Sequence, residues 1–251
     1  MMECTTGLTD DEFDGLLAWL REEGVEGYPP ILGLSGSLRA TLMYLRQNIV
    51  QAVIGEILGV SQPTVSRAIK ALTEALSRTP VVLLLTAEEV PRDCDHRGGR
   101  RHSISPAGTG ATAAICGRGE RKRASASAQI LVLPDGGLVW ASDPYPGSMH
   151  DVAAPGASGL LEGIDPSVWI ADKGYIGRGM ITPHKKPPNG ELSEAAKEAN
   201  KSINRIRQVV ERTIAHIKSW RILHTDYRRP LHTFEQTITA ALSLHAFKTT
   251  L

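Results

Sequence analysis

The fold of the N-terminal region is decided by residues 38–76, LRATLMYLRQNIVQAVIGEILGVSQPTVSRAIKALTEAL. Within this stretch, residues 51–58 (QAVIGEIL) have the apolar spacing of a short helix, and Gly59 can adopt the left-handed conformation that ends a helix. Val60 is placed to fill the angle between two helices, and Ser61 is placed to cap a second one that begins SQPTVSRAIKAL. This order of helix, tight turn and helix predicts a helix-turn-helix.

The second helix of this motif separates apolar from polar side chains. Val65, Ile69 and Leu72 recur at helical spacing and are expected to face inward. The outward positions carry Gln62, Thr64, Ser66, Arg67 and Lys70. Amides, hydroxyls and cations at the start of such a helix contact base edges and phosphates in the major groove. We therefore predict that this helix binds double-stranded DNA; the alternative is a plain helical hairpin with solvated polar positions.

Upstream of this motif, residues 1–36 predict an amphipathic helix followed by a linker. Residues 9–24 start with Thr9, a residue that caps helices, and end at Gly24. The apolar residues between them share one helical face; they are Phe13, Leu16, Leu17 and Leu20. The region is acidic, with Arg21 as its one cation, whereas Arg and Lys dominate the last fifth of the chain. Basic surfaces can therefore form although the net charge is only +1.

The composition is that of a globular protein without a membrane or secretion segment. Hydrophobic residues make up 41% of the chain, and no apolar run approaches the roughly 18 to 20 residues that span a bilayer. The first residues lack the basic and apolar regions of a signal peptide, so we expect a cytoplasmic protein that does not bind membranes. Cys4, Cys94 and Cys116 are too few and too far apart to indicate a zinc site or a disulfide framework.

Residues 129–183 predict an α/β region. QILVLP (129–134) and GLVWAS (137–142) are expected to be strands joined by a hairpin turn at residues 135–137. PYPGSMHD follows as a loop, and VAAPGASGLLEGI as a short or broken helix. SVWIADKGYIG is expected to contribute an apolar strand that ends in Asp172. The end of a strand is where open sheets place catalytic groups.

A basic helical region, in one or two pieces, is predicted from Ser193 to Ile222, ahead of a loop and a final helix through LHTFEQTITAALSLHAF. Its carboxylate Glu211 shares one helical face with Asn204, Arg207 and Lys218. Such a face could hold a metal ion and steer a phosphate backbone. The alternative is a surface helix with ion pairs between neighbouring turns.

Taken together, these segments resemble a known family. The order of VLPDGGLVWASDPYPGSMHD, ADKGYIG, TPHKKP and INRIRQVVERTIAHIKSWRIL resembles the DDE-superfamily insertion-sequence transposases of bacteria, which also carry a helix-turn-helix. The resemblance covers residues 38–90 and 129–248. It implies an α/β (α+β) fold, with a mixed RNase H-like sheet flanked by helices and preceded by a small helical domain. It also implies transposon-end double-stranded DNA as the partner, with a homodimer on that DNA as an open alternative.

The resemblance assigns roles to individual side chains. Asp172 and Glu211 would be the second and third catalytic acids and would hold Mg²⁺ or Mn²⁺ in a two-metal site. Arg207 and Lys218 match the cations that the family has around that Glu, where they would contact DNA. Asn204 stands where related groups often have Tyr.

A further family acid is matched by Asp151, which would support the catalytic site together with His150. Its alternative role is to cap the N-terminus of the following helix.

The first acid of the family is missing from its expected place. It should end an apolar strand, but residues 92–128 are dominated by Arg, Gly, Ala and Ser and contain no Phe, Tyr or Trp. This composition is typical of disorder and predicts no strand. Asp93 and Asp95 lie near the expected place, but no apolar strand precedes them. The sequence on both sides of this window keeps the family pattern. In addition, a degenerate back-translation of the window, shifted by one base, can be read as an aromatic-rich string. We therefore hypothesise a pair of compensating frameshifts.

These interpretations divide the chain into residues 1–36 (helix and linker), 37–79 (helix-turn-helix) and 80–251 (RNase H-like DDE nuclease domain, with 92–128 anomalous). Three functions stay open. The first is a transposase-type DNA-binding protein with an impaired nuclease, and the second is a regulator that uses its helix-turn-helix alone. The third is a working Mg²⁺-dependent endonuclease that recruits Asp93, Asp95 or Asp151 as its third ligand. Loss of a bridging metal ligand would reduce catalysis by orders of magnitude.

Overall fold

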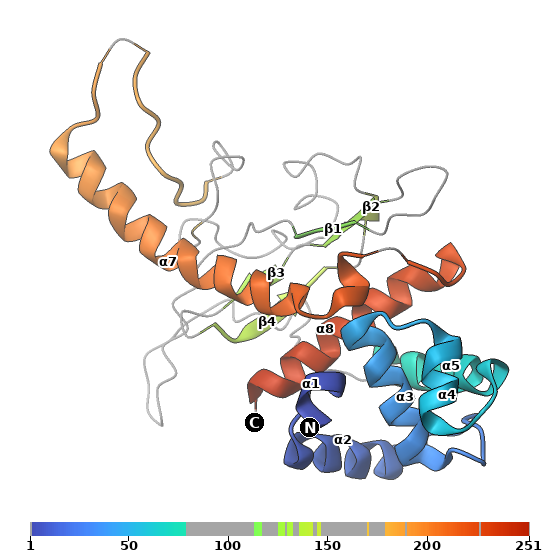
Figure 1. Cartoon of the computed structure of the whole chain (residues 1–251). Helices are drawn as coiled ribbons and strands as arrows, with labels where there is room; N and C mark the ends of the chain where they lie inside the picture. Colours follow the sequence, from blue (N-terminus) through green and yellow to red (C-terminus); the bar gives the residue numbers. More distant parts are fainter. Residues whose placement is uncertain are drawn as a thin grey trace, which may run out of the picture. The chain divides into compact units, whose positions relative to one another are not determined.

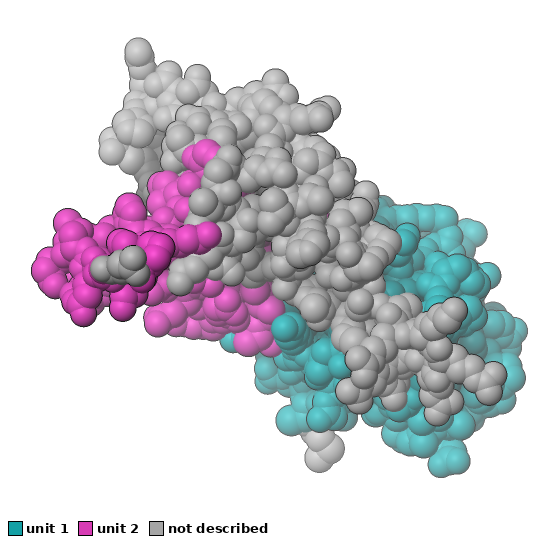
Figure 2. All heavy atoms as spheres, turned by 90° about the horizontal axis from the view of Figure 1, so that it is seen from above, with its two compact units in different colours: residues 1–81, 115–125, 216–251 teal, residues 82–114, 126–215 magenta. Residues whose placement is uncertain are grey.

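The computed structural model describes residues 2–78, 113–116, 125–128, 130–132, 136–142, 145–146, 170, 179–188, 190–225 and 227–250. Contacts divide the chain into two compact units, coloured in Figure 2. Unit 1 comprises residues 1–81, 115–125 and 216–251, and unit 2 comprises residues 82–114 and 126–215. The domain boundaries predicted from the sequence stay a prediction. In the division by contacts, residues 216–251 belong to the same unit as the N-terminal helices.

Unit 1 is built from helices (Figure 1). They are α1 Met2–Thr6, α2 Asp10–Glu22, α3 Gly33–Gln47, α4 Gln51–Leu58, α5 Gln62–Arg78 and α8 Phe234–Thr250, with the 3-10 turns η3 Arg221–Leu223 and η4 Leu231–Thr233. The predicted start of α2 is confirmed, because Thr9 and Glu12 each accept a hydrogen bond from the other's backbone N–H. Its predicted apolar face is buried: Phe13, Leu16, Leu17 and Leu20.

The predicted tight turn between α4 and α5 is confirmed. Gly59 has a left-handed φ of 68°, and the N–H groups of Gly59 and Val60 bond to the carbonyls of Glu56 and Gly55. This pair of bonds is the Schellman arrangement that ends many helices. A Cβ on Gly55 would lie 2.6 Å from the Val60 carbonyl oxygen, so the turn packs this closely because residue 55 is glycine.

The recognition-type helix α5 lies at the centre of the core of unit 1. It packs against α3, α4 and α8. The predicted inward residues Val65, Ile69 and Leu72 are each 0% exposed. The C-terminal helix α8 contributes the buried side chains Ile238, Ala241, Leu242 and Leu244. The last helix of the chain therefore completes the hydrophobic core on which the helix-turn-helix is built.

Polar contacts also fasten the end of α3 to the segment that precedes α8. Asn48, in a left-handed conformation, donates from Nδ2 to Thr225 Oγ1 at 2.6 Å, and its carbonyl oxygen accepts from Arg228 Nη1 at 3.1 Å. Two residues earlier, the Arg46 guanidinium lies 5.7 Å from the ring centroid of the buried Trp220. These contacts join residues that are far apart in the sequence.

The buried imidazole of His245 in α8 makes unit 1 sensitive to acid. Burial, followed by the charges of His216 and Lys248, lowers the pKa of His245 from 6.5 to about 4. The unfolded chain takes up a proton below pH 6.5 and the folded chain does not until about pH 4. Stability is therefore complete above pH 6.5 and falls by about 1.4 kcal/mol for each pH unit down to the folded pKa.

We expect the urea midpoint of the wild-type chain to fall between pH 7 and pH 5 for this reason, and His245→Leu to lose most of that dependence. The matched control is His232→Gln, which alters an exposed histidine and should keep the wild-type dependence. Equal pH dependence in all three proteins would contradict this role of His245.

The remaining elements are the long helix α7 Glu194–Lys218 and short strands (Figure 1). The strands are β1 Ala113–Cys116, β2 Ser125–Ala128, β3 Ile130–Val132, β4 Leu138–Ala141 and β5 Tyr145–Pro146. β3 and β4 form the predicted antiparallel hairpin, with Gly136 in its turn. β1, β2 and β5 follow in that order in a second sheet, in which β2 and β5 are antiparallel. Ile170 makes an isolated parallel bridge to Ile181.

Some elements differ from the sequence predictions. The composition of residues 92–128 predicts no strand, yet β1 and β2 lie within this range. Strand pairing is made by backbone N–H and C=O groups, and the small Ala and Ser side chains of these strands are compatible with it. β5 lies in PYPGSMHD, which the sequence predicts as a loop. The helical region predicted from Ser193 consists of α7 followed by η3. Apart from Ile170, the strand predicted to end in Asp172 lies outside the described residues.

Among the helices that the structure describes, none is long and apolar enough to cross a membrane.

Candidate functional site

The candidate DNA-binding surface lies on the first half of α5. Gln62, Arg67 and Lys70 are exposed, and Ser66 is half-buried. These positions are opposite the buried face that packs into the core of unit 1. An exposed helix face with an amide, a hydroxyl and two cations has the groups that the major groove and its phosphates require.

Thr64 does not belong to this surface, so its predicted outward orientation is wrong. It is 7% exposed, its hydroxyl lies 3.0 Å from Ser61 Oγ, and Arg67 Nη2 donates to the same hydroxyl at 3.4 Å. In the first turn of a helix, a threonine side chain can fold back onto the residue before the helix. Thr64 therefore shapes the start of α5 and contacts Arg67.

A glutamine that the sequence analysis missed completes the surface. Gln51 is the first residue of α4, and its Oε1 accepts a hydrogen bond from Gln62 Nε2 at 2.8 Å. Both helices start with glutamine, which the sequence shows, but the contact between the two side chains depends on the geometry of the turn.

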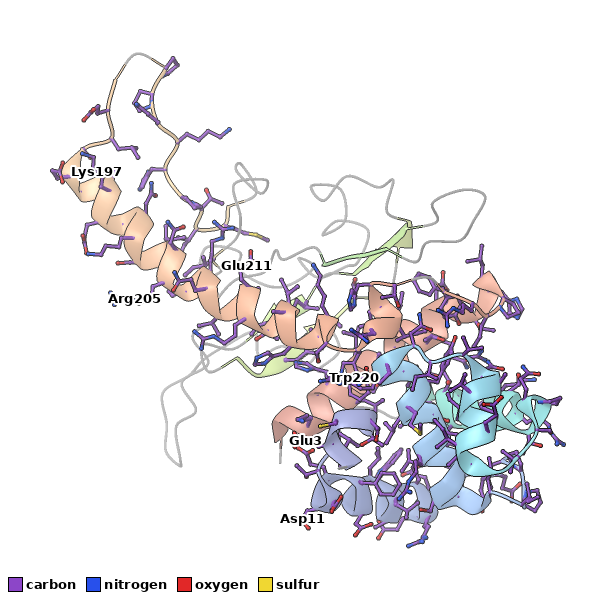
Figure 3. All side chains as sticks on the ribbon, in the orientation of Figure 1. Glu3, Asp11, Lys197, Arg205, Glu211 and Trp220 are labelled. Carbon is purple, nitrogen blue, oxygen red and sulfur yellow. The ribbon has the colours of Figure 1, made fainter. Side chains whose placement is uncertain are left out.

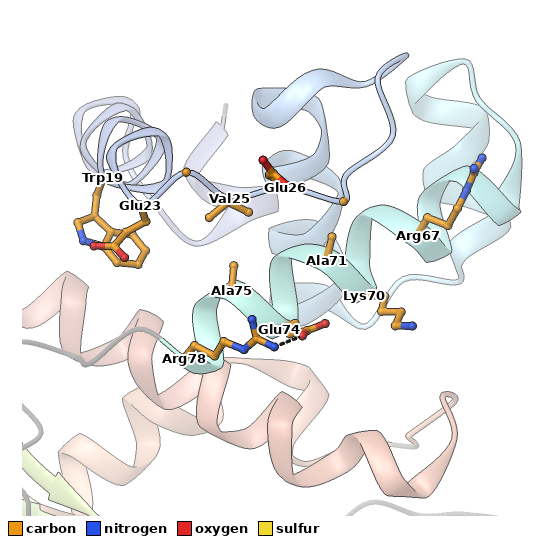
Figure 4. Close-up of a pocket in the computed structure, with 12 residues that line it drawn as sticks. Trp19, Glu23, Val25, Glu26, Arg67, Lys70, Ala71, Glu74, Ala75 and Arg78 are labelled. Carbon is orange, nitrogen blue, oxygen red and sulfur yellow. Dashed lines mark hydrogen bonds and ion pairs between the residues drawn. The ribbon is translucent and has the colours of Figure 1, made fainter.

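A groove of about 680 Å³ runs along α5 and includes part of the candidate DNA-binding surface (Figure 4). One wall is α5 from its second turn onward, and the other is the end of α2 with the residues that follow it. Its charged lining consists of three carboxylates and three cations: Glu23, Glu26, Glu74, Arg67, Lys70 and Arg78, of which Glu74 and Arg78 form an ion pair. Arg67 and Lys70 therefore belong both to this groove and to the candidate DNA-binding surface, and the carboxylates face them across the groove or along α5.

The candidate third acid, Glu211, lies on the exposed side of α7 (Figure 3). Two residues further along, Thr213 Oγ1 donates to the Gly136 carbonyl oxygen in the β3–β4 turn at 3.0 Å. Val210 and Ile214 are buried. The hairpin therefore anchors α7 close to Glu211, while the Glu211 carboxylate stays accessible.

The other predicted residues of this face also lie on α7. Asn204 and Lys218 are exposed, and Arg207 is half-buried. Arg205 projects from a different side of the helix than Glu211 (Figure 3). The intrahelical ion pairs of Lys197 with Glu194 and of Lys201 with Glu198 lie near the start of α7, at a distance from Glu211 along the helix.

The remaining candidate acids lie outside the described residues: Asp172, Asp151, Asp93 and Asp95, with His150. In the part of the chain that the structure describes, no three Asp, Glu, His or Cys side chains gather in a way that could hold a metal. Among the candidate acids, Glu211 is the one that lies in the described residues, and its carboxylate is the hard oxygen donor that Mg²⁺ prefers. It fits as one ligand, and further ligands must come from other segments.

Two family models match the chain. The model described as DDE superfamily endonuclease matches residues 118–246, and the model described as helix-turn-helix of DDE superfamily endonuclease matches residues 32–80. The chain belongs to the DDE superfamily of endonucleases. The resemblance predicted from the motifs is thereby confirmed, and DDE membership implies an RNase H-like fold. The two matches do not include residues 81–117, where the first acid of DDE endonucleases is expected.

Relatives of this DDE chain include proteins named as transposases. A putative transposase for insertion sequence element IS112 of Streptomyces albus G is 28% identical over 231 residues, which is 87% of this chain and 83% of that protein. A probable transposase for insertion sequence element IS702 of Microchaete diplosiphon is 44% identical over 64 residues, which is 24% of this chain and 23% of that protein. No solved structure matches the chain significantly.

Proposed function

We propose that this DDE protein is of transposase lineage, binds the ends of a transposon as double-stranded DNA, and has an impaired nuclease centre. One observation carries the proposal: an exposed helix-turn-helix surface is present, while neither family match includes residues 81–117, where the first acid is expected. The transposon-end target follows from the relatives, both of which are named as transposases. A cytoplasmic location and a homodimer on the DNA are part of the proposal.

In this proposal, α5 enters the major groove. Gln62 and Ser66 contact base edges, while Arg67 and Lys70 bind phosphates on either side of the groove. The exposure of these side chains and the buried opposite face of α5 support that orientation. Arg207 and Lys218 on α7 would bind the DNA backbone at the nuclease centre.

The proposed nuclease centre consists of Asp172 and Glu211, supported by Asp151, on a mixed RNase H-like sheet. Asp172 and Glu211 would hold Mg²⁺ or Mn²⁺, and two such ions, when bound, supply activation of the nucleophile and stabilisation of the leaving oxygen. The accessible carboxylate on an anchored α7 supports the role of Glu211. An antiparallel hairpin and a parallel bridge between Ile170 and Ile181 are compatible with a mixed sheet.

The proposed impairment follows from the missing first acid. A DDE centre without this carboxylate loses one ligand of its metal ions, so phosphodiester hydrolysis and strand transfer should fall by orders of magnitude. The same interruption favours a second candidate function, a non-enzymatic DNA-binding regulator. The two candidates differ in whether repair of residues 92–128 produces an active nuclease.

Substitution of the phosphate-binding cations tests the DNA-binding function. Arg67→Ala and Lys70→Ala should each weaken binding to duplexes of any sequence and reduce the salt slope of log K by about one, since each removes one phosphate contact. Fluorescence anisotropy over a range of salt concentrations measures both quantities. The control is Arg78→Ala, a cation near the other end of the same helix that is paired with Glu74. Equal salt slopes in all four proteins would refute the proposed orientation of α5.

A further inference from the structure

The hydrogen bond between Gln62 and Gln51 lies at the exposed edge of the helix-turn-helix. Gln62 is the first residue of α5 and Gln51 the first residue of α4, and Gln62 Nε2 donates to Gln51 Oε1 at 2.8 Å. Gln62 is exposed and Gln51 is half-buried. The Schellman turn at Gly59 and the close contact of Gly55 with the Val60 carbonyl set the backbone between the two glutamines.

This contact orients the amide of Gln62 and leaves it the donor and acceptor with which glutamine can read a base. A glutamine amide has two N–H donors and one carbonyl acceptor. With one N–H directed to Gln51, Gln62 retains one donor and, beside it, one acceptor. In the major groove, adenine presents the N7 acceptor next to the N6 donor, whereas guanine presents two acceptors, N7 and O6. The remaining groups of Gln62 therefore complement adenine and do not complement guanine.

We propose that Gln51 is a positioning residue that fixes the amide of Gln62, so that Gln62 selects an adenine in an A·T pair of the target site. The inference rests on the proposed DNA-binding function of α5 and adds a base preference to it. Holding the long Gln62 side chain before DNA arrives also reduces the conformational entropy that binding would otherwise cost. Gln51 therefore both orients the Gln62 side chain and restricts its conformational freedom before DNA binds.

The test starts from the full chain without divalent metal, to exclude cleavage. Selection from a randomised duplex library gives the preferred site, and anisotropy then compares each A·T pair of that site with G·C in its place. The variants are Gln62→Ala, Gln51→Met, which removes the acceptor at similar length, and Gln51→Glu, which keeps an acceptor. Gln208→Ala, an exposed glutamine on α7, is the control.

At one position the wild-type chain and the control should prefer A·T to G·C by on the order of tenfold or more. Gln62→Ala should remove that preference, and Gln51→Met should reduce it by about threefold to tenfold. Gln51→Glu should retain the preference while weakening binding to all duplexes, because its charge repels phosphates.

Three results would overturn the inference while leaving DNA binding in place. They are a guanine at the position that depends on Gln62, a preference that Gln51→Met leaves unchanged, and an equal loss of preference in Gln51→Met and Gln51→Glu. Failure of the wild-type chain to bind any duplex would instead refute the DNA-binding function itself.

Discussion

Ala241→Asp in α8 is expected to destabilise unit 1 strongly and thereby weaken DNA binding, although α8 lies outside the residues that match the helix-turn-helix family model. The Ala241 side chain is 0% exposed, and α8 packs against α5. A carboxylate placed there loses its hydration without gaining a partner, which costs several kcal/mol out of a total stability of roughly 5 to 15 kcal/mol. Circular dichroism should show a melting temperature lower by more than about 10 °C, and anisotropy should show DNA affinity reduced at least tenfold.

The matched control is Glu235→Gln, which alters an exposed position on the same helix and should leave both measurements unchanged. If Ala241→Asp lowered the melting temperature while DNA affinity stayed at the wild-type level, α4 and α5 would fold without α8. That result would contradict the role of the C-terminal helix in supporting the recognition helix.

Repair of the reading frame across residues 92–128 is expected to raise Mg²⁺-dependent DNA nicking by orders of magnitude. If the hypothesis of two compensating frameshifts is right, reversing them should restore an apolar strand that ends in the first acid. With three carboxylates the centre can hold both metal ions, whereas two carboxylates leave one bridging position without its ligand. The rate of nicking on transposon-end duplexes, compared between the repaired and the original chain, measures this effect.

Two variants of the repaired chain test its site. Asp172→Ala and Glu211→Ala should each return nicking to the level of the original chain, whereas Glu198→Ala, an exposed acid near the start of α7, should not. A gene with no alternative open frame across this window would exclude the frameshift hypothesis. A repaired chain that binds DNA but stays inactive would favour the non-enzymatic regulator.

The helix-turn-helix could be predicted from the sequence because its signals are local. Gly59 marks the turn, and the spacing of Val65, Ile69 and Leu72 marks the buried face of α5; the structure confirms both. The same spacing predicts that Thr64 faces outward, but Thr64 is buried and its hydroxyl interacts with Ser61. Helical periodicity gives the direction of a side chain only approximately, and a local hydrogen bond can override it.

The partner of α8 could not be predicted from the sequence. LHTFEQTITAALSLHAF is apolar around most of the helix, which indicates burial but not which surface covers it. The contact of α8 with α5 and the bond between Asn48 and Thr225 join segments at opposite ends of the chain. Such long-range pairings are set by the assembled core and leave no short pattern in the sequence.

For the candidate nuclease centre, the sequence predicts the residues but not whether they lie close together. The sequence order identifies Glu211 on a basic helix, and the structure adds the anchoring bond between Thr213 and Gly136. The proposal that Asp172 and Glu211 share metal ions still rests on the resemblance to the family. It is this juxtaposition that an experiment must test.

The most direct measurement is a titration of the full chain with Mn²⁺, in which electron paramagnetic resonance reports the concentration of the free ion. We expect Asp172→Ala and Glu211→Ala to weaken binding alike, by at least about tenfold, and Glu198→Ala to bind as the wild-type chain does. If either of the first two variants kept wild-type Mn²⁺ affinity, the two carboxylates would not share a metal site, and the proposed nuclease centre would be wrong.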